Sequence, residues 1–154
     1  MKSLPRLFAT LALLIAGSVA YAAAETPAAT PEKDKEDTEL TKKMDKVNKA
    51  YRKLRKQAGD MTKNAESLEL VATMRENAAA AAKLEPFKLT EIPAADRLKM
   101  LEGYRAKMKE FLSTIDQLGA ALKAGHNDEA AKLVEVLKAL QKEGHEEYKS
   151  KSID

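Results

Sequence analysis

The chain has 154 residues, and it contains no cysteine and no tryptophan. This excludes disulfide bonds, thiolate metal sites, iron–sulfur clusters and a cysteine nucleophile. Charged residues make up 33% of the chain and aromatic residues 5%, with only 6 glycines and 5 prolines. Such a composition is typical of helical proteins and poor material for β-sheets.

Residues 1–24 have the pattern of a secretory signal peptide. Lys2 and Arg6 give a positive start, residues 7–20 are almost wholly apolar, and Ala22 closes a small-x-small cleavage pattern. The apolar run is about 14 residues, short of the roughly 20 that a membrane span needs. We therefore expect export to the periplasm and removal of the segment, which leaves no stable membrane anchor. An uncleaved anchor is the alternative.

Residues 25–37 are rich in alanine, proline, threonine and alternating charge, and they predict a disordered leader. Loss of the signal peptide removes Lys2 and Arg6, so 25 basic and 24 acidic residues remain. A net charge near +1 gives no indication of a nucleic acid partner. Residues 38–154 are then the expected folded domain.

The first half of this domain carries two apolar stripes at helical spacing. Thr38 should cap the first helix and Gly59 should end it, whereas Asn64 should cap the second. The interval from Glu85 to Pro93 should interrupt the helical pattern. The stripes are Leu40, Met44, Val47, Tyr51, Leu54 and Ala58, then Leu68, Val71, Met74, Ala78 and Ala81.

The second half carries two more stripes. Gly125 should end the third helix, and Asn127 should cap the fourth, with Asp128 and Glu129 in its first turn. The third stripe is the most regular: Leu101, Tyr104, Met108, Phe111, Ile115, Leu118 and Leu122. The fourth is Ala130, Leu133, Leu137, Leu140, Gly144 and Tyr148.

Four amphipathic helices each need a partner for one apolar face. Short connections favour antiparallel neighbours. The sequence therefore predicts an all-α fold, an antiparallel up-down-up-down four-helix bundle. We expect it to be a monomer.

The chain lacks the common catalytic patterns. It has no G-x-S-x-G segment, no phosphate-binding glycine loop and no Glu-x-x-His pair. We do not expect an enzyme. Of its two histidines, His126 lies in a predicted turn and should be exposed.

Met44 and His145 lie near the start of the first helix and the end of the fourth. In the predicted topology these two ends are adjacent. The usual roles are core filling for Met44 and a structural histidine at the edge of an apolar stripe for His145. Together they offer a second interpretation, because a thioether and an imidazole form a known axial pair for haem iron.

Four segments of the chain resemble the periplasmic cytochrome b562 family, over roughly residues 38–150. They are ELTKKMDKVNKA, ATMRENAAAAAKLEPFKL, IDQLGAALKAGHNDEAAKLVEVLKAL and HEEYK. The resemblance implies one non-covalent haem b with Met44 and His145 as iron ligands, and electron transfer with an unidentified redox partner protein. It also implies pocket contacts from Leu40, Val47, Met74, Pro86, Tyr104, Met108 and Leu137.

Two departures from the family leave an alternative open. Gln141 stands where the resemblance leads one to expect arginine, and Gly144 where it leads one to expect an aromatic residue. These changes would loosen the pocket, or mark a member that has lost haem. The main alternative is a haem-free exported helical chaperone or stress adaptor, which should expose apolar surface. A copper or other metal site built from methionine and histidine is a third option, with only one inward histidine to support it.

The first predicted helix is strongly basic. Eight lysines and arginines between residues 42 and 56 stand against Glu39 and Asp45. A solvated face is the simplest interpretation. Docking on an acidic redox partner or on anionic lipid are the alternatives.

Overall fold

The structure is a computed structural model that describes residues 38–150. In this range the chain forms four α-helices and two short 3₁₀ helices, with no β-strand. They are α1 (Glu39–Leu54), η1 (Met61–Lys63), α2 (Asn64–Ala81), η2 (Phe87–Glu91), α3 (Ala94–Lys123) and α4 (Asn127–Tyr148). The predicted signal peptide and leader, residues 1–37, lie outside the described residues, as do residues 151–154.

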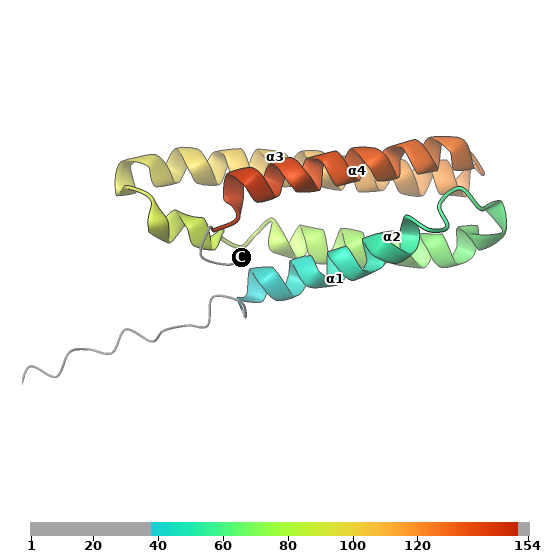
Figure 1. Cartoon of the computed structure of the whole chain (residues 1–154), viewed down its shortest axis with the longest axis horizontal. Coiled ribbons are helices and arrows are strands. Elements are labelled where there is room, and N and C mark those ends of the chain that lie inside the picture. Colours follow the sequence, from blue (N-terminus) through green and yellow to red (C-terminus); the bar gives the residue numbers. More distant parts are fainter. Residues whose placement is uncertain (1–37, 151–154) are drawn as a thin grey trace, which may run out of the picture. The chain divides into compact units, whose positions relative to one another are not determined.

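The helices run alternately up and down (Figure 1). α1 packs on α2, α2 on α3, and α3 on α4. α4 returns beside α1, where the Tyr51 hydroxyl donates a hydrogen bond to the Val134 carbonyl at 3.4 Å and Gln141 Nε2 donates to Asn48 Oδ1 at 3.3 Å. The predicted four-helix bundle is confirmed.

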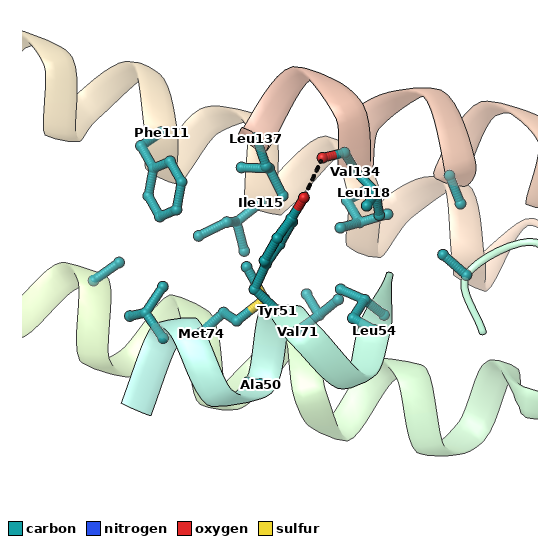
Figure 2. Packing of buried hydrophobic residues seen from close by; sticks show 14 of the residues in the cluster. Ala50, Tyr51, Leu54, Val71, Met74, Phe111, Ile115, Leu118, Val134 and Leu137 are labelled. Carbon is teal, nitrogen blue, oxygen red and sulfur yellow. Dashed lines mark hydrogen bonds between the residues drawn. The ribbon is translucent and has the colours of Figure 1, made fainter. Parts of the chain in front are cut away.

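The four apolar stripes meet in one core (Figure 2). All four helices contribute to it, and on α2 the small buried residues Ala78 and Ala81 have no exposed surface. Full burial of a leucine contributes roughly 1.5–3 kcal/mol. The largest fully buried apolar side chains are Leu54, Met74, Ile115, Leu118, Leu122 and Leu137.

Two predicted helix ends are confirmed. Thr38 Oγ1 accepts the backbone N–H of Thr41 at 3.1 Å and so caps α1. Gly125 follows α3 with a φ of 74°. It forms the glycine of a Schellman turn, in which the His126 N–H reaches the Ala121 carbonyl at 2.9 Å.

The predicted caps Asn64 and Asn127 are wrong. Each asparagine is the first residue of its helix, and neither helix has a side-chain cap. Their amides pair with each other instead: Asn127 Nδ2 donates to Asn64 Oδ1 at 2.7 Å and to the Ala58 carbonyl at 2.8 Å. Asn64 Nδ2 donates to the Leu122 carbonyl at 3.1 Å. Long-range partners outcompete local capping here, and the result joins the two loops at one end of the bundle.

One helix boundary differs from prediction: α1 ends at Leu54, and hydrogen-bonded turns occupy the residues up to Gly59. The predicted interruption from Glu85 to Pro93 is confirmed, because α2 ends at Ala81 and α3 begins at Ala94, directly after Pro93. No helix between residues 38 and 150 is long and apolar enough to span a membrane.

Candidate functional site

A cavity of about 270 Å³ lies at the end of the bundle where α1 begins and α4 ends. α1, α3, α4 and the loop before η2 all contribute to its wall. Its apolar lining residues are Leu40, Met44, Pro86, Phe87, Tyr104, Met108, Phe111, Leu140 and Tyr148. Its other lining residues are Thr38, Thr41, Asp45, Asn48, Lys107, Gln141, Gly144, His145, Lys149 and Ser150.

Met44 and His145 line this cavity from different helices. Met44 is half-buried on the apolar stripe of α1, three residues before the buried Val47. His145 belongs to the last turns of α4, where its carbonyl accepts the Lys149 N–H, and its imidazole lines the cavity with no hydrogen bond or ion pair found for it among residues 38–150. The up-down-up-down order therefore brings one thioether and one imidazole to a single cavity.

The imidazole of His145 is biased toward its neutral form. The residue is exposed overall, but partial removal of the ring from solvent lowers the pKa of His145, and the positive charge of Lys149 lowers it further. A neutral imidazole keeps a nitrogen lone pair available for a metal ion.

Two tyrosines form an aromatic part of the wall. Tyr104 is buried and its hydroxyl donates to the Ala81 carbonyl at 2.8 Å. Burial raises the pKa of Tyr104 to about 12. Its ring meets that of Tyr148 edge to face, with ring centroids 5.5 Å apart. Gly103 leaves room for this contact, because a Cβ there would lie 2.8 Å from the Tyr148 hydroxyl.

The structure brings six of the nine predicted site residues together. Leu40, Pro86, Tyr104 and Met108 line the cavity with Met44 and His145. The other three, Val47, Met74 and Leu137, are at most 2% exposed and belong to the core cluster that also contains Tyr104 and Met108. They do not line the cavity.

Sequence reasoning missed several lining residues. Phe111 and Tyr148 stood on predicted stripes, so the stripe itself was a sufficient signal. Asn48 carried no signal, and Gln141 was singled out only through the family resemblance, so the hydrogen bond that joins them across the α1–α4 gap was not predicted. Gln141 thus contacts α1 at the position where the family resemblance suggested a cation.

Lys107 also lines the cavity, and it is already paired with glutamates. Lys107 Nζ lies 2.8 Å from Glu143 Oε2 and 3.6 Å from Glu110 Oε2. This contact raises the pKa of Lys107 and ties α3 to α4 beside the cavity. The charge at this edge is therefore largely neutralised within the bundle.

The donor set fits haem b better than a bare metal ion. Among residues 38–150 no three histidine, aspartate or glutamate side chains gather to hold a metal. A thioether and a neutral imidazole, on two helices that flank a mostly apolar cavity, match the ligands and surroundings of a six-coordinate haem. The residues present fit that group.

The chain is an antiparallel four-helix bundle with a cavity between its first and last helices. This arrangement is typical of the helical bundles that hold a cofactor between facing helices. A model of the cytochrome b562 family matches residues 39–149. The chain belongs to the cytochrome b562 family, a family of non-enzymatic, haem-binding helical electron carriers. No curated protein and no solved structure matches the chain.

Proposed function

We propose that this protein is an exported one-electron carrier that holds one haem b non-covalently between α1 and α4. The observation that carries the proposal is the meeting of Met44 and His145 at one apolar cavity. Membership of the cytochrome b562 family supports the same cofactor. The family is usually periplasmic, in agreement with the export signal expected in residues 1–24.

Met44 and His145 are the proposed axial ligands. When bound, haem supplies a one-electron iron couple. The thioether of Met44 favours the ferrous state, and the neutral ring of His145 donates without first losing a proton. If both side chains held the iron, no position would remain for oxygen or a substrate, which would suit electron transfer.

The other wall residues exclude water. The Tyr104 hydroxyl donates its hydrogen bond to the Ala81 carbonyl. The residue therefore contributes the apolar surface of its ring to the cavity wall. Leu40, Pro86 and Met108 add further apolar surface from three elements of the chain. Val47, Met74 and Leu137 support this wall from within the core. We propose that the carrier acts as a monomer with a redox partner protein yet to be identified.

The haem-free adaptor is less well supported. It requires exposed apolar surface, yet the large exposed apolar residues between 38 and 150 are Met61, Leu98 and Val136. They lie singly on η1, α3 and α4, and isolated exposed apolar residues are normal in soluble proteins. The described surface therefore offers no apolar patch for a client protein.

A haemin titration tests the proposal. The purified protein is titrated with haemin, and its absorbance is read oxidised and reduced. We expect a saturable one-to-one Soret change and sharp reduced α and β bands. A spectrum like that of free haemin would contradict the proposal, and assays of chaperone activity would then follow.

A further inference from the structure

The outer face of α1 and its following turn carries a line of lysines. Lys42, Lys46, Lys49, Lys53 and Lys56 follow at steps of four, three, four and three residues, which places them along one side of the helix. All five are exposed. We call this set the lysine ridge.

The positive charge of the bundle is concentrated on this segment. Residues 39–56 hold eight basic and two acidic residues, whereas residues 57–150 hold fourteen basic and sixteen acidic residues. The opposite side of α1 is committed to the core through Val47, Ala50 and Leu54. Outside residues 39–56 the bundle is therefore slightly negative, and this segment gives it one basic face.

Four of the five ridge lysines are not neutralised within the described residues. Lys46, Lys49, Lys53 and Lys56 make no ion pair within residues 38–150, although other lysines such as Lys107 do. Like charges at these helical spacings repel and destabilise a helix. Lys42, at the end of the first turn, also lies near the positive end of the helix dipole. An external anionic surface would relieve both costs.

We propose that the lysine ridge docks the bundle on an anionic phospholipid surface. Lysine is depleted in protein–protein interfaces, whose anchors are tyrosine, tryptophan and arginine. The exposed positions of α1 carry no aromatic or large apolar side chain. Rows of lysines next to a membrane are instead attracted by acidic headgroups, as point charges without directional contacts.

The docking is electrostatic and shallow. The apolar residues of α1 lie in the core or, as Leu40 and Met44, line the cavity, so the ridge itself offers none to enter the acyl region. The part of the ridge on α1, from Lys42 to Lys53, spans about 17 Å along the helix at 1.5 Å per residue, and a flat surface can contact this whole length at once. Lys49 follows Met44 by five residues, roughly 140° around the helix, so the docked bundle keeps its cavity away from the lipid.

Vesicle cosedimentation of the purified protein tests this proposal without any cofactor. The vesicles contain equal parts phosphatidylglycerol and phosphatidylcholine, at about 0.01 M salt, where the Debye length is about 30 Å. The ridge variant carries Lys46→Gln, Lys49→Gln and Lys53→Gln. The control variant carries Lys99→Gln, Lys109→Gln and Lys123→Gln, three exposed lysines of α3. Both variants lose the same charge and keep good helix formers.

We expect the wild type to sediment with these vesicles and to be released by about 1 M salt, where the Debye length is about 3 Å. The ridge variant should bind about a hundredfold more weakly, a loss of about 3 kcal/mol, and the control variant less than about threefold more weakly. Circular dichroism confirms that both variants are folded.

Three results would overturn the proposal. The first is no sedimentation of the wild type with phosphatidylglycerol vesicles. The second is an equal loss in both variants, which would reduce the effect to net charge. The third is equal binding to pure phosphatidylcholine. If the first result is accompanied by binding of the wild type to soluble polyglutamate, the ridge is assigned to an acidic protein.

Discussion

Met44 and His145 differ in how firmly the bundle holds them. Met44 lies in the first half of a capped helix, next to the buried Val47. His145 is exposed and follows Gly144 in the last turns of α4. The methionine position is therefore fixed by packing, whereas the histidine is free to adjust to what it binds.

The two ligands should contribute unequally to haem binding. We expect Met44→Ala to leave a weaker haem complex with an altered reduced spectrum, because the imidazole remains. His145→Ala should largely abolish the complex, because the stronger donor is lost. Absorbance titration with haemin measures both effects.

Matched controls are available for each ligand variant. Met61 is 65% exposed on η1, and His126 lies at the far end of the bundle between α3 and α4. Met61→Ala and His126→Ala should bind haemin like the wild type. If either control weakens binding as much as its ligand variant, the ligand assignment is wrong.

The buried hydroxyl of Tyr104 predicts a loss of stability in alkali. Its pKa is raised from 10.0 to about 12 by burial, so the folded state holds this proton more tightly than the unfolded state. The contribution of the Tyr104 hydroxyl to the free energy of unfolding is complete below about pH 10 and is lost as pH rises towards about 12. Over this range Tyr104 should account for up to about 2–3 kcal/mol of unfolding free energy.

Chemical denaturation of the wild type and of Tyr104→Phe between these pH values measures this contribution. The variant loses the hydrogen bond to Ala81 and should be less stable at neutral pH. Its stability should nevertheless fall less steeply with rising pH. Parallel curves for the two proteins would contradict the role given to this hydroxyl.

Most predicted residues of the site that line the cavity belonged to a stripe, whereas Pro86 came from the family resemblance. Met44, Tyr104 and Met108 lie on stripes, and the topology brought His145 to the same end. Asn48 and Gln141 were not predictable, because their pairing depends on the separation of α1 and α4. The same holds for Asn64 and Asn127, whose local capping signal was overridden by partners far away in the sequence.

At the level of elements, hydrophobic periodicity predicted all four helices. It misplaced the end of α1, because the stripe continues to Ala58 although the helix ends at Leu54. The prolines, and not a stripe, indicated where α3 begins. The first turns of α3 have high helix propensity but largely exposed side chains. Hydrophobic periodicity reveals a helix through its buried side. Turns that are helical but exposed therefore give no such signal.

Substitution by alanine should have opposite effects on stability at Gly144, inside α4, and at Gly125, which follows α3. Gly144 lies inside α4 with nothing within 4 Å of a Cβ, so Gly144→Ala should stabilise the haem-free protein by about 0.5–1 kcal/mol. Gly125 has a φ of 74°, so Gly125→Ala should destabilise it by about 1 kcal/mol.

Thermal unfolding of the two variants beside the wild type measures both effects. Because a Cβ would meet nothing within 4 Å at either glycine, backbone conformation alone determines whether alanine raises or lowers the stability. A stabilising Gly125→Ala or a destabilising Gly144→Ala would show that the helix ends differ from those described.

At the level of the whole molecule, the alanine-rich core predicts that a bound cofactor adds measurable stability. Haemin that binds only the folded state should stabilise it by about 2.7 kcal/mol at a free concentration of 100 times Kd. Thermal melts with and without haemin should therefore separate for the wild type. They should nearly coincide for His145→Ala, and coincident melts for the wild type would contradict the proposed function.

The paired amides of Asn64 and Asn127 make the two ends of the bundle unequal. At their end, side chains join both interhelical loops through the carbonyls of Ala58 and Leu122. At the other end a cavity separates α1 from α4. We therefore expect α1 and α4 to separate more readily at the cavity than at the joined loops. Amide hydrogen exchange should therefore be slow near Leu54 and Ala130 and become faster along both helices towards Met44 and His145.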